Sequence, residues 1–396
     1  MKKALIICFA LMFSGIQAFA LNEKVVVWEQ IYQQSDRDEQ RVAIILKIME
    51  FKDREFAPVL LNALTQLVSR RVEDGTATER YNKNKLAMLL VRELGNLNSA
   101  ESADLVFSLY EEVKEPVLKG EAAMALGKMR ADGFAEILSF DLSSLNLRAD
   151  PAISRNQEIL ALGLVQSLNS MRSILGYEAV FLASSGWYSN ISKVKETAKA
   201  ALVTMVDDPT DSLLKILSTN PSMDIKADAL EASLSSKASA ERKCLVATEA
   251  LQIGMDRATL DKTEAAVAGK LRINAIVALT GLRDKTPGNV EVFKNIIKKD
   301  SKNDSTIDET LKAYVALGVN GSDDAAAFLV TRLDEYNVFE KSKANTLRDK
   351  SIIRQIIASM VLSKNPKVKN ELIKSQFVDY DSLVIREIEA AIKTLP

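Results

Sequence analysis

The chain of 396 residues contains no histidine and only two cysteines, Cys8 and Cys244. Without histidine, Ser-His-Asp and Cys-His catalysis, His-ligated zinc and the side chain best suited to proton transfer near neutral pH are all excluded. Two cysteines are too few for a thiolate metal cage. The chain also lacks glycine-rich phosphate-binding motifs and the G-x-S-x-G pattern. The sequence therefore predicts a protein that is not an enzyme and holds no cofactor or metal.

Three weaker patterns could still carry chemistry. Residues 192–195 match the S-x-x-K pattern of serine acyl-transfer enzymes, but Lys195 falls within a helical pattern and the partner motifs are missing. Residues 300–304 loosely resemble a calcium loop, without its glycine and terminal glutamate. Pairs of Asp and Glu remain available for glycoside hydrolysis. Aromatic residues make up only 6% of the chain, and Trp28 and Trp187 are its only tryptophans, which disfavours a sugar-stacking cleft.

A row of basic residues is one candidate binding feature. Lys119, Arg155, Lys195 and Arg272 recur at the same place in an internal repeat. One interpretation is an ion-pair ladder with acidic turn residues along a stack of helices. The other is a basic stripe that binds an acidic partner.

An aromatic pair is the second candidate. Trp187 and Tyr188 lie within a loop of small residues, 184–190. Trp and Tyr are favoured anchors of protein interfaces, so we take both as candidate partner-binding residues. The alternative is that Trp187 fills an irregular joint between repeats.

An internal repeat of Ala- and aliphatic-rich helices must position these residues. Its clearest copies carry Leu-Gly at Leu94, Leu126, Leu162 and Leu317, and weaker copies have their anchor at 46, 202, 234, 279, 360 and 392. The anchors are spaced by roughly 38 residues, between the tetratricopeptide period and the HEAT and armadillo range. No alternating β-branched run leads into a hairpin turn. The pattern predicts an all-α chain with polar connections at 73–84, 141–154, 300–308 and 340–350.

Three segments resemble HEAT repeats closely: 118–127, 271–279, and 194–202 with the Asp-Pro turn that follows it. From about residue 37 to its end, the chain is similar to the HEAT-repeat (armadillo-like) family. The resemblance implies a right-handed α-solenoid of about nine to ten helix pairs, with one continuous core over 21–396. It also implies that a concave surface, formed by the second helices, binds another protein.

Residues 1–20 have the features of a secretory signal peptide. Lys2 and Lys3 precede an apolar run, and Ala18-Phe19-Ala20 predicts cleavage after Ala20. We therefore expect a periplasmic or secreted protein. No later segment is apolar enough over the length that spanning a bilayer needs. Residues 21–36 are predicted to cap the array, with a helix over 22–34. Cys244 then remains as the only cysteine, and we expect it to be a buried small hydrophobic residue.

The net charge of −1 lacks the positive excess with which nucleic-acid-binding proteins neutralise phosphate, so we expect protein partners and no nucleic acid. The predicted function is that of an extracytoplasmic, non-enzymatic protein-binding or scaffolding protein. The alternative is an all-α secreted hydrolase that acts on carbohydrate or cell wall through an Asp/Glu pair. A third possibility is a structural homo-oligomer that stacks end to end.

Overall fold

A computed structural model of the chain describes residues 23–147, 155–255, 262–300 and 307–395. All regular structure in these ranges is helical, and they contain no strand, which confirms the prediction of an all-α chain. The helices form two compact units, residues 1–206 and 207–396. The predicted signal peptide lies outside the described residues.

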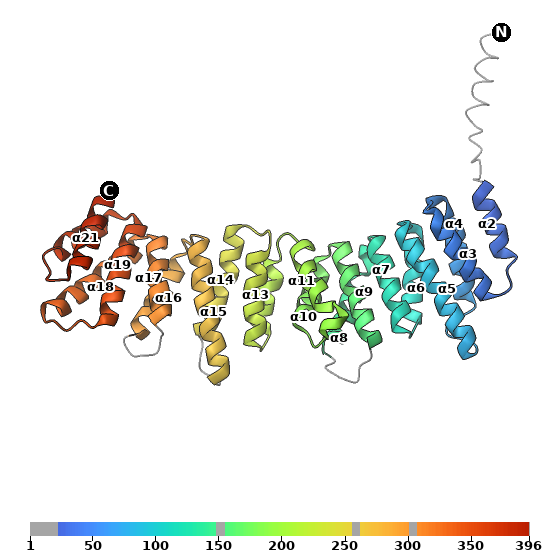
Figure 1. Cartoon of the computed structure of the whole chain (residues 1–396), viewed down its shortest axis with the longest axis horizontal. Coiled ribbons are helices and arrows are strands. Elements are labelled where there is room, and N and C mark those ends of the chain that lie inside the picture. The colour runs from blue at the N-terminus through green and yellow to red at the C-terminus, as the bar shows by residue number, and fades with distance from the viewer. Residues whose placement is uncertain (1–22, 148–154, 256–261, 301–306, 396) are drawn as a thin grey trace, which may run out of the picture. The chain divides into compact units, whose positions relative to one another are not determined.

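The first unit contains ten described helices (Figure 1). They are α2 (Glu23–Gln33), α3 (Asp38–Phe51), α4 (Ala57–Ser69), α5 (Ala77–Asn96), α6 (Ala103–Glu112), α7 (Pro116–Lys128), α8 (Ala135–Leu147), α9 (Arg155–Met171), α10 (Tyr177–Ser185) and α11 (Val194–Thr204). A single 3-10 turn leads into each of α4, α6, α8 and α10. The helix predicted over 22–34 is therefore present as α2.

The second unit also contains ten described helices. They are α12 (Thr210–Thr219), α13 (Met223–Ser235), α14 (Ala240–Met255), α15 (Lys262–Gly281), α16 (Pro287–Asp300), α17 (Ile307–Asn320), α18 (Asp323–Lys341), α19 (Leu347–Ser363), α20 (Lys369–Ser375) and α21 (Ser382–Thr394). The loop before α19 shows how the sequence starts a helix. Thr346 and Asp349 form a reciprocal capping box that satisfies two backbone N–H groups at the helix start.

Within each unit the helices pack in two rows (Figure 1). The odd-numbered helices pack on one another in order, from α3 to α11 in the first unit and from α13 to α21 in the second. Each even-numbered helix packs against the odd-numbered helix that follows it. Each helix therefore buries its apolar stripe against neighbours in the chain, which is the local packing of repeat proteins.

All ten predicted anchors lie in the odd-numbered helices α3 to α21. Leu94, Leu126 and Leu317 are fully buried, as expected. At four copies the buried position is the residue before the anchor. Leu46 and Leu234 are exposed and Leu162 and Ile392 are half-buried, whereas the preceding residues Ile45, Ser233, Ala161 and Ala391 are buried.

All four expected polar connections are shorter than predicted. Residues 77–84 already belong to α5 and 141–147 to α8, and helices also include 300, 307–308, 340–341 and 347–350. In the two longest of these segments the expectation was wrong because polar residues on a helix face look like a loop in the sequence. Residues 148–154 and 301–306 lie outside the described residues.

Glycines lie where neighbouring odd-numbered helices come closest. A Cβ atom on Gly163 of α9 would lie 2.5 Å from the carbonyl oxygen of Gly120 in α7. Similarly, a Cβ atom on Gly127 would lie 2.6 Å from the Cα of Ser167, and one on Gly318 would lie 2.5 Å from the Ser359 carbonyl oxygen. The glycine of the Leu-Gly repeat therefore allows two helix backbones to touch.

We expect Gly163→Ala to lower the free energy of unfolding of the first unit by about 1–3 kcal/mol, because the added methyl overpacks the contact between α7 and α9. Alanine is the better helix former, so propensity alone would change stability in the opposite direction. Both tryptophans belong to the first unit, so urea unfolding followed by tryptophan fluorescence measures this value. Gly133→Ala is the matched control, since a Cβ there has no neighbour within 4 Å. Equal stability of the two variants would contradict the packing argument.

Candidate functional site

The loop that carries Trp187 and Tyr188 is fixed to the end of α8. The Trp187 indole N–H donates to the carbonyl of Leu145 at 2.9 Å, and the Tyr188 hydroxyl donates to the Asn146 amide oxygen at 2.7 Å. Tyr188 is only 1% exposed and Trp187 is half-buried. Burial places Tyr188 out of reach of a partner and favours the interpretation of Trp187 as a filler of the joint. A role of either residue in binding stays a prediction.

Three of the four predicted basic residues lie in the first turns of consecutive odd-numbered helices: Lys119 in α7, Arg155 in α9 and Lys195 in α11. Lys119 pairs with Asp141 at 3.2 Å, and its ammonium lies 4.4 Å from the centre of the Tyr110 ring. Asp141 belongs to α8 and not to a turn. The residues therefore form a row as expected, and Lys119 is held by an ion pair within the fold.

Arg272 differs from the other three because it lies in the middle of α15 and is only 3% exposed. Its guanidinium pairs with Glu309 of α17 at 2.5 Å and donates to the carbonyl of Gly254 at 2.6 Å. A group so placed is part of the core, so Arg272 does not belong to an accessible basic stripe. The ladder interpretation fits it better, although its partner lies in a helix and not in a turn.

A different set of basic residues is exposed at the ends of the helices. Nine described residues other than glycine have a positive φ, and eight of them are Lys or Arg. The residues with a positive φ at the ends of α5, α7 and α9 are Asn98, Arg130 and Arg172, with φ of 52°, 52° and 54°. Asn98 and Arg130 close their helices with Schellman hydrogen bonds, from Ser99 N–H to Leu94 and from Ala131 N–H to Leu126.

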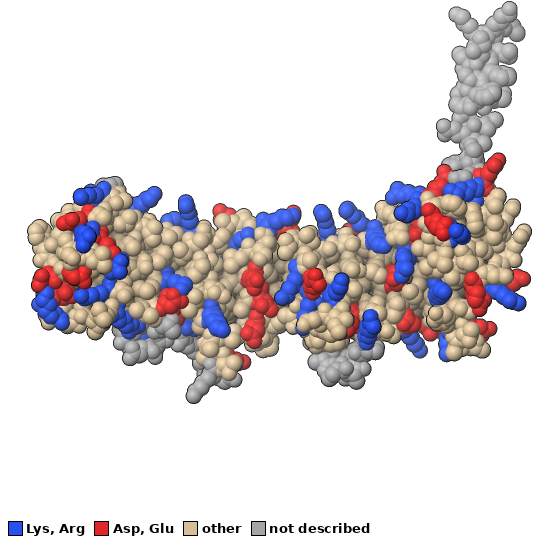
Figure 2. Space-filling model, viewed as in Figure 1, with Lys and Arg blue, Asp and Glu red and all other residues tan. Residues whose placement is uncertain are grey.

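A groove of about 630 Å³ lies across these helix ends in the first unit. Its side chains come from the ends of four helices: Asn96 and Asn98 at the end of α5, Lys128 and Arg130 at the end of α7, Asn169, Ser170 and Arg172 at the end of α9, and Thr204 of α11. We call it the basic groove, because its lining includes three basic residues and none of the described residues that line it is acidic or aromatic. Elsewhere the visible surface mixes Lys and Arg with Asp and Glu (Figure 2).

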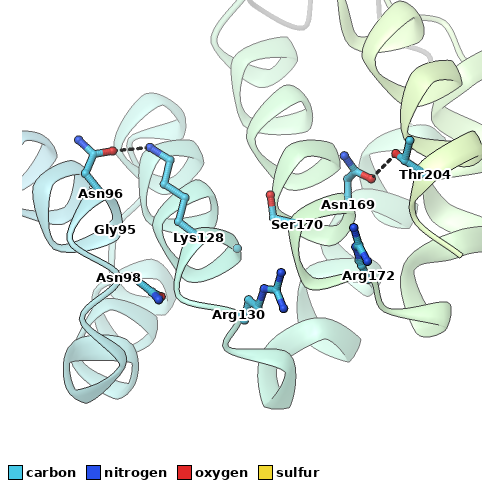
Figure 3. Close-up of a pocket in the computed structure, with 10 residues that line it drawn as sticks. Gly95, Asn96, Asn98, Lys128, Arg130, Asn169, Ser170, Arg172 and Thr204 are labelled. Atoms are coloured by element: carbon cyan, nitrogen blue, oxygen red, sulfur yellow. Dashed lines mark hydrogen bonds between the residues drawn. The ribbon is translucent and has the colours of Figure 1, made fainter.

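Hydrogen bonds between adjacent helix ends organise the basic groove (Figure 3). The Lys128 ammonium donates to the Asn96 amide oxygen at 2.7 Å, and the Thr204 hydroxyl donates to the Asn169 amide oxygen at 3.1 Å. Arg130 lies between these two pairs and Arg172 lies beside the second. Within the described part of the chain, neither guanidinium forms an ion pair or a hydrogen bond. Both are exposed and available to an anionic group.

The arginines at positions 130 and 172 carry a cost in stability. A non-glycine residue in the left-handed region costs about 1–3 kcal/mol. A basic side chain at a helix C-terminus regains about 0.3–1 kcal/mol from the helix dipole. Stability alone therefore favours glycine at both positions, as it does at the six other described left-handed positions that Lys or Arg occupies.

A second pocket, of about 480 Å³, lies among α16 to α19 in the second unit. Buried Tyr314 and Tyr336 line it together with two carboxylates, Glu335 and Asp349. Glu335 pairs with Arg332, and Asp349 accepts the Thr346 N–H at 2.8 Å as a helix cap. Both carboxylates are engaged by neighbouring groups, so this pocket gives no specific support to a hydrolase.

Cys244 is half-buried, so the expectation of a buried residue is only partly met. Burial raises the pKa of its thiol to about 11, with a further contribution from the charges of Asp284 and Glu241. In the described ranges, no group of three or more Cys, Asp and Glu side chains is placed to hold a metal ion. No described helix combines the length and apolar content that crossing a bilayer requires.

Sequence reasoning found the row at the start of the odd-numbered helices and missed the groove at their ends. One regularity in the sequence could have indicated the groove. Asn98 and Arg130 each stand three residues after the glycine of a Leu-Gly pair, Gly95 and Gly127. Glycine or asparagine is expected just past a helix end. An arginine just past a helix end, such as Arg130, therefore does not reveal in the sequence that the helix ends there.

Comparison with known proteins identifies no relative of this chain: no family model matches it, and no curated protein does.

We expect Arg272→Ala to destabilise the second unit by about 3–5 kcal/mol, because it leaves the Glu309 carboxylate buried without its partner. Circular dichroism during urea unfolding measures the loss. The double variant Arg272→Met, Glu309→Leu removes both charges and is expected to recover most of the stability. If the single variant unfolds like the unmodified chain, Arg272 is not a structural residue.

We expect Cys244 to react with a thiol reagent at pH 8 on the order of 100-fold more slowly in the folded chain than in urea, because little thiolate forms below its raised pKa. The rate is expected to rise about tenfold per pH unit toward pH 11, as the thiolate fraction grows. Stopped-flow labelling of a Cys8→Ser chain measures this single thiol. A folded rate equal to the rate in urea would contradict the burial argument.

Proposed function

We propose that this chain is an extracytoplasmic, non-enzymatic binding or scaffolding protein, built as a HEAT-like α-solenoid, whose basic groove binds an acidic segment of a protein partner. The observation that carries the proposal is the pair of exposed, unpartnered arginines, Arg130 and Arg172, in a groove without acidic lining residues.

The helix order supports the solenoid part of the proposal. Nine successive pairs, from α4 with α5 to α20 with α21, repeat the same packing within the two units, among the described residues. Stacked pairs of this kind form the extended binding surfaces of repeat proteins. The step from such a fold to a scaffold remains an analogy with the HEAT-repeat proteins that the sequence resembles.

The chemistry of the basic groove supports an acidic partner. Two guanidinium groups and one ammonium group attract carboxylates over several ångströms and speed their encounter. The net charge of −1 for the whole chain argues against a general affinity for polyanions such as nucleic acid. The extracytoplasmic location rests on the signal peptide that residues 1–20 predict.

We expect the double variant Arg130→Gly, Arg172→Gly to recover about tenfold less of the partner protein than the unmodified chain. The reason is that two exposed ion pairs contribute up to about 2 kcal/mol together. In-cell crosslinking of a C-terminally tagged chain, followed by mass spectrometry, measures the recovery. Glycine relieves the backbone strain at both positions, so the variant is expected to be at least as stable in urea as the unmodified chain.

The matched control is Arg71→Gly with Arg283→Gly. Both control residues are exposed arginines with a positive φ, at the ends of α4 and α15 and outside the basic groove. The control therefore removes two similar charges from the same kind of backbone position. A partner that is recovered equally with both double variants does not bind through the basic groove.

A further inference from the structure

We propose that the segment bound in the basic groove is an extended peptide with two acidic residues three positions apart, Asp/Glu-x-x-Asp/Glu, which lies across the ends of α5, α7, α9 and α11. This inference rests on the proposed function and specifies the chemistry of the partner.

The spacing of the cationic groups carries the argument. Lys128 and Arg130 mark the end of α7, and Arg172 marks the end of the next odd-numbered helix, α9. Helices that pack side by side have their axes about 8–10 Å apart. A peptide in the extended polyproline II conformation advances about 3.1 Å per residue with three residues per turn, so positions i and i+3 lie about 9 Å apart on the same side of the chain. One carboxylate at α7 and one at α9 are therefore matched by acidic residues at positions i and i+3.

The remaining lining residues fit a peptide backbone. Asn96 and Asn98 precede the first cationic position, and Asn169 lies between the two. An amide side chain offers both a donor and an acceptor, which match the carbonyl and N–H groups of an extended chain. Carbohydrate is the less suitable ligand, because none of the described lining residues is an aromatic that could pack on a sugar ring.

Helix ends also explain why the bound segment is expected to be extended. The four ends present polar groups in a line that crosses the helix axes (Figure 3). A helical peptide advances only 1.5 Å per residue, so three residues would cover about half of the distance between two ends. An extended segment instead meets each helix end once.

The test measures the affinity of the full chain for two fluorescent peptides of equal composition, by anisotropy at low salt. One peptide carries its two aspartates at i and i+3, and the other carries them at i and i+1, among Ser, Ala and Gly. The spaced peptide is expected to bind about fivefold more tightly, because only it reaches Arg172 while it pairs with Lys128 or Arg130.

The variant Arg172→Gly sharpens the test. It is expected to weaken the spaced peptide about fivefold and to leave the adjacent peptide unchanged, whereas Arg71→Gly is expected to change neither. Equal affinities of the two peptides, or an equal effect of Arg172→Gly on both, would overturn the inference. It would also be overturned if alginate oligomers, an acidic polysaccharide without amides, bind more tightly than the spaced peptide.

The two proposals fail in different ways. If crosslinking shows that the partner depends on Arg130 and Arg172 while the two peptides bind alike, the groove binds its partner but not in this register. If the spaced peptide binds through Arg172 while recovery of the partner is unaffected by the groove variant, the inference stands and the proposed function is wrong.

Discussion

The odd-numbered helices stack because small residues let their backbones touch. In the first unit, Gly120 and Gly163 bring α7 and α9 together, and Gly95 meets Ala125 between α5 and α7. In the second unit, Gly318 meets Ser359 in the same way. A larger side chain at any of these contacts would push two helices apart. Because each helix also packs on the next, the displacement would be passed along the row.

The same contact determines where the helix ends lie. Helices held this closely end at comparable heights, so the residues that terminate α5, α7 and α9 form a line. Each of these helices stops through a residue in the left-handed conformation. That residue turns the chain toward the next even-numbered helix and leaves its own side chain exposed. The basic groove is thus a product of how the helices end as much as of what lies on their faces.

Two sets of basic residues in this fold differ in whether a carboxylate pairs with them. Arg272 and Arg92 pair with a carboxylate on the following odd-numbered helix, so their charges are satisfied within the row. Arg130 and Arg172 extend beyond the ends of their helices, where no carboxylate among the described lining residues meets them. Sequence position alone does not distinguish these two sets, because all four residues belong to the same kind of repeat.

The helical class and the periodic anchors could be predicted because apolar spacing reflects local burial, which depends on neighbours in the sequence. The register at Leu46 and Leu234 could not. Ile45 and Leu46 are both apolar, and at the other copy a polar residue, Ser233, is the buried one. The burial of Arg272 was hidden because α15 begins earlier than the repeat suggests, which places a basic residue in mid-helix. The groove itself depends on backbone dihedral angles and on four helix ends that lie side by side, and no single stretch of sequence records either feature.

The left-handed position that ends α3, α5, α7 and α17 has a consequence for how such a protein diversifies. Lysine, arginine, asparagine and glycine all occupy it in this chain, at Lys52, Arg130, Asn98 and Gly321. A mutation among them alters the charge at one edge of a repeat and leaves the helix contacts beside it intact. Selection can therefore change the charge of this edge one repeat at a time, and duplicated copies of the gene can diverge in surface charge before they diverge in fold.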